Sequence, residues 1–227
     1  MPQRATGQDL LTWAESLSAI ARTGLAFTES LYERERYEEV IRVAAEMLTF
    51  VHDDLEADSV AIEMMKSVGK GVAGYVTPKV AIGAVVGNER GEILLIQRSD
   101  SGVWLYPTGW ADVGYSPSEV AVKEVHEETG IECEPLRLMA VLDGVRMGFT
   151  QIPLYSLVFL CRATGGELKP HPWETRDAGW FSRDNLPSPL ANLERWVEPA
   201  FRAIDGEDVD VDFDLPRSSP WEEPRSV

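Results

Sequence analysis

The spacing of the apolar residues changes near residue 68 and divides the chain into two differently built parts. Before this point, apolar residues recur three or four positions apart, which is the repeat of one face of an α-helix. The stretches with this repeat are 10–21, 37–51 and 61–68, and Gly24 is expected to end the first helix. So short a helical region cannot bury all of its own apolar faces. We therefore expect it to pack on the rest of the chain, on a second subunit, or on both.

After residue 79 the apolar residues form short runs rich in β-branched side chains, a pattern typical of buried strands. The runs lie at 80–86, 92–97, 133–142 and 154–161, with a shorter one at 179–181. A turn cluster at 87–91 joins the first two runs into a predicted hairpin, and Gly165-Gly166 is predicted to turn the chain. Helical spacing returns at 192–204. Strands mixed with helices predict an α/β domain.

Composition places the expected boundaries. We expect a helical domain at 1–68, a linker at 69–78, the α/β domain at 79–205 and an acidic, Pro-rich tail at 206–227. Residues 69–74 spell G-x-G-x-x-G, but a helical pattern precedes them and a strand follows, the reverse of a dinucleotide-binding fingerprint. We interpret them as a glycine linker. The tail has too little apolar surface to fold alone, so a mobile segment and a strap across the surface both remain open.

The segment from Ser116 to Gly130 carries signals for both ends of a helix. Ser116 is a preferred N-cap, Pro117 suits the first helical position, and Glu119 completes a capping box. Gly130 supplies the stop. We therefore predict a helix over 117–129.

Two neighbouring faces of this predicted helix differ in chemistry. One is apolar and is expected to pack on the domain; it consists of Val122, Val125 and Thr129. The other is acidic and is expected to face a cleft; it consists of Glu124, Glu127 and Glu128. Lys123 falls outside both faces and is expected to point to water. Close carboxylates repel one another unless cations neutralise them, and oxygen ligands suit Mg²⁺. From the spacing alone, a metal site for phosphate chemistry and a solvated acidic face both remain open.

The sequence around the helix narrows the choice. Residues 104–110 join an apolar strand to a Gly/Pro turn, and residues 109–131 read GWADVGYSPSEVAVKEVHEETGI. This strand, loop and helix resemble the Nudix hydrolase motif, a G, an E, an REU, an EE and a GU at fixed spacings, where U is bulky and apolar. The match includes Gly109, Glu124-Val125, Glu127-Glu128 and Gly130-Ile131. Two positions depart, because Tyr115 stands for the first family Glu and Lys123 for the family Arg.

This resemblance implies a fold and a reaction. The fold is the Nudix α/β/α sandwich, a mixed sheet between helices. The reaction is metal-dependent hydrolysis of a pyrophosphate link by water, with Mg²⁺ or Mn²⁺ as the cofactor. The implied metal ligands are Glu124, Glu127, Glu128 and the carbonyl of Gly109. Glu124 or Glu128 would orient or deprotonate the water, and Lys123 would support these carboxylates in place of the family Arg.

Substrate contacts are assigned from the same resemblance. Arg98 follows a predicted strand where family members often carry an Arg near the substrate phosphates. Glu174 lies in a loop where they often place a further acid. A surface Arg and a solvated loop Glu are the simpler interpretations, and the nearby His171 is expected to face solvent. Stacking on a nucleobase and packing in the core both remain open for Tyr106, Trp110, Tyr115 and Phe149.

The helical region followed by GWADVG-x-SPSE is similar to a Nudix subgroup that includes ADP-ribose and CDP-choline pyrophosphatases. This implies a substrate in which a nucleoside diphosphate carries a second moiety, cleaved to a nucleoside monophosphate and a phosphorylated moiety. The choice between the two substrates stays open. One rival is a house-cleaning pyrophosphatase for nucleoside triphosphates. The other is a non-catalytic Nudix domain that senses a nucleotide.

Charge and composition limit the partners. The chain has 21 Lys and Arg against 38 Asp and Glu, a net charge of −17, which argues against binding of bulk nucleic acid. Cys133 and Cys161 are too few for a disulfide framework and are expected to be buried or idle thiols. The start of the chain does not resemble a signal peptide and no apolar run reaches about 18 residues, so we expect a cytoplasmic protein with no membrane partner. We expect the N-terminal helices to form a homodimer; the alternative is a helical cap within a monomer.

Overall fold

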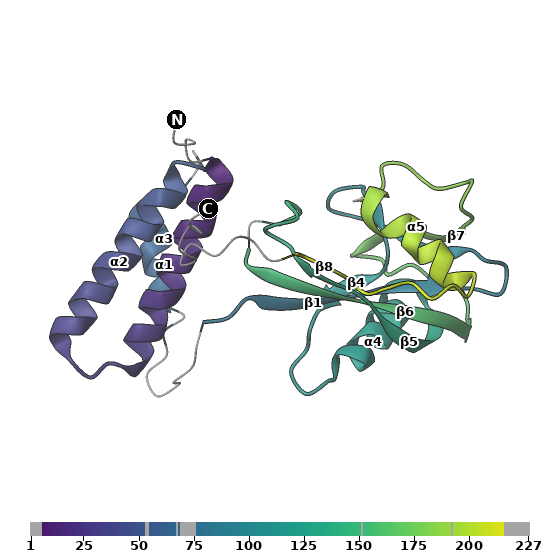
Figure 1. Ribbon diagram of the computed structural model, residues 1–227, viewed down its shortest axis with the longest axis horizontal. Coiled ribbons are helices and arrows are strands. Elements are labelled where there is room, and N and C mark those ends of the chain that lie inside the picture. Colours follow the sequence, from purple (N-terminus) through teal and green to yellow (C-terminus); the bar gives the residue numbers. More distant parts are fainter. Residues whose placement is uncertain are drawn as a thin grey trace, which may run out of the picture. The chain divides into compact units, whose positions relative to one another are not determined.

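The computed structural model describes residues 6–52, 55–66, 68, 76–150, 152–191 and 193–215. The chain divides into two compact units (Figure 1). The first contains the chain up to residue 79 together with the segment 148–153, and the second contains the rest. The glycine motif at 69–74 and the end of the tail at 216–227 lie outside the described residues.

The first unit is helical, as the apolar spacing predicts. Its helices are α1 (Gly7–Phe27), α2 (Leu31–Thr49) and α3 (Ala57–Lys66). Thr6 and Asp9 form a capping box at the start of α1, and the Ser30 hydroxyl accepts the Glu33 N–H at the start of α2. The core between the helices is made of small and branched apolar residues, namely Ala21, Leu25, Ile41, Ala45 and Ala61.

Two details of the helical prediction are wrong. Helix α1 does not end at Gly24 but continues to Phe27. Gly24 serves packing instead, because a Cβ added there would lie 2.3 Å from the ring of Tyr37 on α2. Helix α3 begins earlier than its apolar pattern indicates, and Ile62, expected on the apolar face, is 53% exposed.

Helix α1 carries two apolar rows. The first row points into the unit and consists of Leu11, Ala14, Ser18, Ala21 and Leu25, all buried. The second row precedes the first by one residue and consists of Leu10, Trp13, Leu17 and Ile20. Trp13 is 49% and Ile20 is 64% exposed. Both rows follow the alternating three- and four-residue spacing of helix–helix seams, but among the described residues only the first row is fully buried.

The second unit is built on a mixed sheet. Its strands are β1 (Lys79–Gly87), β2 (Ile93–Arg98), β3 (Trp104–Leu105), β4 (Thr108–Trp110), β5 (Ile131–Asp143), β6 (Leu154–Gly166), β7 (Thr175–Phe181) and β8 (Asp212–Phe213). The order across the sheet is β3-β2-β1-β6-β5-β8, while β4 pairs with β1 and β7 with β2. The β1–β2 hairpin is confirmed, and β5 pairs with β8 in parallel.

Two helices cover the two faces of this sheet. Helix α4 (Pro117–Thr129) packs on one face and α5 (Leu193–Ile204) on the other, below and above the sheet in Figure 1. Successive residues of β1 alternate between the faces, with Ala84 and Val86 in the α4 core and Val85 in the α5 core. The α/β/α sandwich is therefore confirmed. Cys133 and Cys161 are free thiols buried in the α4 core.

The strands differ from the prediction in two places. The predicted turn at Gly165-Gly166 is wrong, because both glycines are the last residues of β6. Gly166 has φ +85° and lies so close to the backbone of Gly130 and Glu132 that a Cβ would collide with it. Strand β7 is longer than predicted and starts at Thr175, where its pairing with Arg98 begins.

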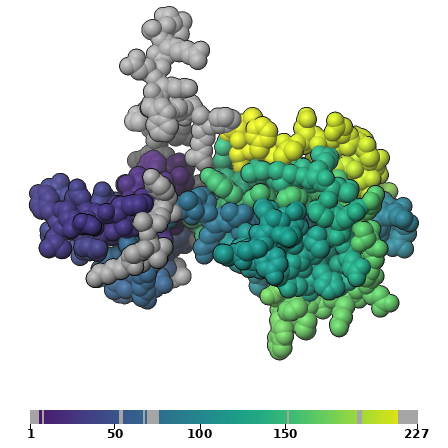
Figure 2. Space-filling view, turned by 90° about the horizontal axis from the view of Figure 1, so that it is seen from below, coloured from purple at the N-terminus to yellow at the C-terminus, as the bar shows by residue number. Residues whose placement is uncertain are grey.

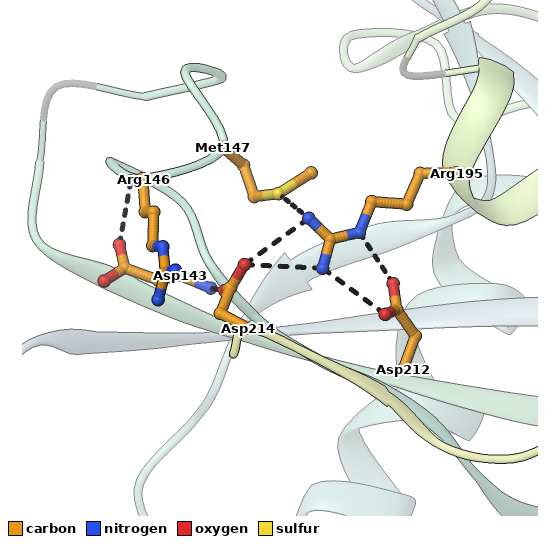
Figure 3. A network of polar contacts seen from close by, with 6 residues as sticks. All are labelled: Asp143, Arg146, Met147, Arg195, Asp212 and Asp214. Carbon is orange, nitrogen blue, oxygen red and sulfur yellow. Dashed lines mark hydrogen bonds and ion pairs between the residues drawn. The ribbon is translucent and has the colours of Figure 1, made fainter. Parts of the chain in front are cut away.

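The tail forms a strap as far as it is described. Residues 212–213 pair with Ala140 and Val141 of β5. Arg195 of α5 binds Asp212 at 2.7 Å and Asp214 at 3.3 Å and also contacts Met147 (Figure 3). The Asp214 carboxylate accepts the Asp143 N–H at 2.7 Å. Of the two alternatives left open, residues 206–215 therefore take the strap. Within the described part of the chain, every helix is too short or too polar to span a bilayer.

Candidate active site

Helix α4 is specified by its own sequence. The Ser116 N–H donates to the Glu119 carboxylate at 2.6 Å, the Ser116 hydroxyl accepts the Glu119 N–H, and Gly130 ends the helix with φ +74°. The predicted bounds are confirmed. Val125 and Thr129 are fully buried as expected, but Val122 lies only at the edge of the core. The core face is centred on Val120, Ala121 and Val125 instead.

Glu124 lies directly against Gly109. A Cβ added to Gly109 would lie 2.3 Å from the carboxyl carbon of Glu124, so any other residue here would displace that carboxylate from its present position. Pairing of Gly109 with Ile82 of β1 fixes the backbone there. The Glu124 side chain is 13% exposed. Its burial raises its pKa, and neighbouring Glu127 and Asp112 add to the rise while Lys123 opposes it.

Glu128 is the most deeply buried acid of the cluster. It is 5% exposed, and one carboxylate oxygen accepts the Thr108 N–H at 2.9 Å. Burial raises its pKa to about 8, and the charges of Glu124 and Glu174 add to this rise. The Thr108 hydrogen bond and Arg98 lower the pKa but do not outweigh burial.

Glu127 and Lys123 form the outer part of the cluster. The Lys123 ammonium lies 2.9 Å from Glu127, 3.0 Å from Asp112 and 3.9 Å from Glu124. The expectation that Lys123 points to water is therefore wrong; its hydrogen bonds to Glu127 and Asp112 raise its pKa. Asp112 was not singled out from the sequence, because nothing local shows that its loop returns to α4. Helix α4 and this loop lie in teal on the face seen in Figure 2.

The inner residues fit a hard divalent cation. Burial raises the pKa values of Glu124 and Glu128, and the opposing effects of Lys123 on Glu124 and of Arg98 on Glu128 are smaller. As the side chains lie, no three His, Cys, Asp or Glu side chains of the described residues surround one ion position. Glu127 is instead turned to Lys123. Mg²⁺ is commonly held by one or two carboxylates, with water and substrate phosphates completing its shell. The two inner carboxylates, Glu124 and Glu128, are ligands of that kind.

Arg98 and Glu174 lie near the two inner carboxylates. The Arg98 guanidinium binds Asp100 through two hydrogen bonds of 2.6 and 3.0 Å. Glu128 and Glu174 also act on it electrostatically, and all three acids raise its pKa, Asp100 the most. The Ser99 N–H donates to the Glu174 carbonyl at 3.0 Å, which ties the loop before β7 to the end of β2. The Glu174 side chain is 66% exposed.

His171 is a site neighbour that the sequence did not reveal. Its N–H donates to the Glu128 carbonyl at the end of α4, at 3.1 Å. The ring Nδ1 is buried without a hydrogen-bond partner among the described residues and lies 3.9 Å from a Glu174 carboxylate oxygen. The expectation that His171 faces solvent holds only in part, because its side chain is 36% exposed while its Nδ1 is buried. Its role depends on how the loop folds back on α4, which no local pattern records.

The four aromatic residues considered for stacking on a nucleobase lie in different surroundings. The Tyr106 ring packs edge-on against Trp196 in the α5 core, 5.0 Å between centroids, so stacking on a base is excluded for this ring. Tyr115, in the loop before α4, is 55% exposed. Trp110, the last residue of β4, is 51% exposed. Phe149 is 41% exposed but belongs to the segment that groups with the helical unit.

Two family models match the chain. One, described as the NUDIX domain, matches residues 77–204. The other, described as a UDP-X-like N-terminal oligomerisation domain, matches residues 8–62. The two matches fall on the α/β unit and the helical unit respectively.

Similar proteins match over much of the chain. The Bacillus subtilis (strain 168) protein YjhB, provisionally named an ADP-ribose pyrophosphatase, is 36% identical over 205 residues, 88% of this chain and 95% of that protein. An 8-oxo-dGDP phosphatase of Mus musculus is 40% identical over 113 residues, 47% of this chain and 33% of that protein.

Solved structures of proteins with related names also match this chain. A UDP-X diphosphatase matches with a TM-score of 0.53 and 30% identity, covering 92% of this chain and 100% of that one. An ADP-ribose pyrophosphatase from Streptococcus suis 89-1591 matches with a TM-score of 0.51 and 37% identity, covering 61% and 100%.

Proposed function

Because this chain belongs to the Nudix hydrolase family, we propose that it hydrolyses the pyrophosphate link of a nucleoside diphosphate derivative, with Mg²⁺ or Mn²⁺ as its cofactor. The products are a nucleoside monophosphate and a phosphorylated second moiety. The inward pair Glu124 and Glu128 carries this proposal, since their raised pKa values mark buried acids that a cation would compensate. In a solvated acidic face, all three carboxylates would be exposed, whereas here only Glu127 is.

Each side chain of the cluster is assigned a role from its position. Glu124, Glu128 and the Gly109 carbonyl would hold the cation, and Glu127 would join them on leaving Lys123. A cation held there would neutralise charge on the diphosphate oxygens and make water a better nucleophile. Glu124 or Glu128 orients or deprotonates that water. Glu128 suits either role, because the Thr108 N–H fixes one of its oxygens.

Three further residues are assigned to the substrate. Arg98 binds a phosphate oxygen, since Asp100 holds its guanidinium from one side and the acids of the site attract it. Glu174, in the loop before β7, is assigned to the same part of the substrate as Arg98, on which it acts electrostatically. Tyr115 offers an exposed ring for a base or sugar. The domain pattern proposed with them is helices at 1–68, linker at 69–78, Nudix domain at 79–205 and tail at 206–227.

The names of the relatives favour a nucleoside diphosphate with a second moiety. The proteins named for ADP-ribose and UDP-X match most of this chain, including its helical unit. A UDP derivative therefore joins ADP-ribose and CDP-choline as a candidate substrate. The 8-oxo-dGDP phosphatase matches less than half of the chain. Oxidised nucleotides therefore rank as a second candidate, behind the substrates named for proteins that match most of the chain.

Product release from a panel of these compounds, with Mg²⁺ or Mn²⁺, tests the proposal. The panel contains ADP-ribose, CDP-choline, UDP-sugars, 8-oxo-dGDP and nucleoside triphosphates, each with the wild type and with Glu124→Gln. We expect metal-dependent release of a nucleoside monophosphate, reduced about a hundredfold or more in the variant. Binding of a nucleotide without metal-dependent hydrolysis of any compound would instead favour a sensor domain.

We also propose that the chain forms a homodimer through the second row of α1. This row, Leu10, Trp13, Leu17 and Ile20, has the spacing of a helix–helix seam and includes exposed Trp and Ile side chains. The matched family description of this region as an oligomerisation domain supports a second copy as the occupant.

Sedimentation of the full chain tests this assembly. Ile20→Glu places a charge in the row and is expected to shift the chain to monomer at micromolar concentration. The matched control, Ala19→Glu, adds the same charge on another face of α1 and is expected to remain dimeric. A monomeric wild type, or a dimeric Ile20→Glu, would contradict the proposed surface.

A further inference from the structure

Lys123 is shared by carboxylates from two segments. Glu127 and Glu124 belong to its own helix, at 2.9 and 3.9 Å. Asp112 comes from the loop before the helix and lies at 3.0 Å. The ammonium therefore lies on the outer side of the cluster, in direct contact with two acids, and stands about one ångström further from the acid that packs on Gly109.

The helix alone does not determine this placement. A Lys four residues before a Glu is the weaker orientation of a helical ion pair, so Glu127 is a modest anchor. Glu124 is the more buried acid, and a Lys released from the outer side would find its strongest attraction there. An ammonium paired directly with Glu124 would compete with a cation for the same oxygens. Asp112 supplies the opposing attraction.

The base of the loop holds Asp112 in place. The neighbouring Ala111 N–H donates to the Val80 carbonyl of β1 at 2.9 Å. Beyond Asp112 the loop projects into solvent, where Val113 is fully exposed and Tyr115 is 55% exposed. Asp112 is thus the acid of this loop whose backbone is adjacent to the sheet, while the Tyr115 position has no carboxylate.

We propose that Asp112 is a positioning residue, which holds the Lys123 ammonium at the outer side of the cluster and leaves Glu124 free to bind a divalent cation. In this chain Asp112 supplies the loop carboxylate that is absent at Tyr115, and it pairs with Lys123, which stands at the position of the family Arg. The inference rests on the proposed function, because it assumes a cation at Glu124.

Mn²⁺ affinity, measured by electron paramagnetic resonance on the full chain, tests it without any hydrolysis. We expect Asp112→Asn to weaken Mn²⁺ binding about three- to fivefold, the upper end of the scale for a partly exposed ion pair. In a Lys123→Met background the same change should alter the affinity by less than about twofold, because no ammonium remains to be held. Glu89→Gln, in the β1–β2 turn, makes the same change in net charge away from the site and serves as the control.

A carboxylate returned to the loop provides the rescue. Tyr115→Glu, added to Asp112→Asn, should recover Mn²⁺ affinity to within about twofold of the wild type, whereas a purely structural role of Asp112 would leave the loss unchanged. Wild-type affinity in Asp112→Asn, or an equal loss with and without Lys123, would overturn the proposal. A chain that binds Mn²⁺ in this pattern but cleaves no nucleotide would refute the proposed reaction and leave the positioning role intact.

Discussion

Glu128→Gln should stabilise the protein against unfolding in the absence of divalent metal, and more so as the pH rises. Gln keeps the shape of the side chain and an oxygen that accepts the Thr108 N–H. It removes the charge that burial makes unfavourable. The raised pKa of Glu128 means that the folded chain holds a proton at neutral pH that the unfolded chain has lost.

The sign and size follow from the two pKa values. Below pH 4.5 the acid is protonated in both states and carries no penalty. Stability is then lost as the pH rises from 4.5 to about 8, above which the penalty is complete. At about 1.4 kcal/mol per pKa unit, this difference corresponds to at most about 5 kcal/mol. Because neighbouring charges are coupled, we expect a gain of a few kcal/mol.

Urea unfolding in the presence of a chelator measures this gain. Tryptophan fluorescence includes the signals of Trp104 and Trp196, which are buried in the α/β unit and should respond to its unfolding. The difference in unfolding free energy between Glu128→Gln and the wild type should be small near pH 5 and reach its maximum near pH 8.5. Glu127→Gln, an exposed acid on the same helix, should show no such pH-dependent gain. Equal differences at both pH values would refute the reasoning that burial of the ionised Glu128 is costly.

Three further predictions concern packing and orientation. Gly109→Ala should displace the Glu124 carboxylate, lowering turnover about tenfold or more and the free energy of unfolding by about 1–3 kcal/mol; wild-type turnover would contradict the close contact. His171→Asn should retain more turnover than His171→Gln, because the Asn amide can place a donor near the position of Nδ1, 3.9 Å from Glu174. The reverse order would indicate that Nε2, and not Nδ1, is the ring nitrogen that supports turnover. Arg195→Met should speed hydrogen exchange in residues 207–215 without affecting α4, and unchanged exchange would show that strand pairing alone holds the strap.

Helix α4 was predictable because its signals are local. Ser116 and Glu119 satisfy each other across one turn, and Gly130 needs only its own backbone conformation to end the helix. The two cores on opposite faces of the sheet likewise follow from residues that alternate along β1 and β2. The resemblance to the Nudix motif then supplied the architecture.

The finer geometry of the site depends on contacts between distant segments. Glu124 packs on Gly109 only because β4 pairs with β1 in one register. Asp112 and His171 meet α4 through loops whose course the sequence pattern does not fix. Strand β8 was missed for a related reason, because two residues form a strand only when a partner strand is already there.

The strap affects how easily the protein could self-associate through an edge of its sheet. Without β8, the long strand β5 would form the outer edge of the sheet and present backbone donors and acceptors to other molecules. Two register irregularities in β5, between Pro135 and Arg137 and between Leu138 and Ala140, interrupt that strand, and such breaks discourage continuous pairing with a foreign strand. The regular stretch that remains is Ala140–Asp143, and β8 pairs with its first two residues, Ala140 and Val141. Acidic side chains flank the covering strand. Residues 212–213 therefore cover part of an edge of β5 that would otherwise be open to pairing with another strand.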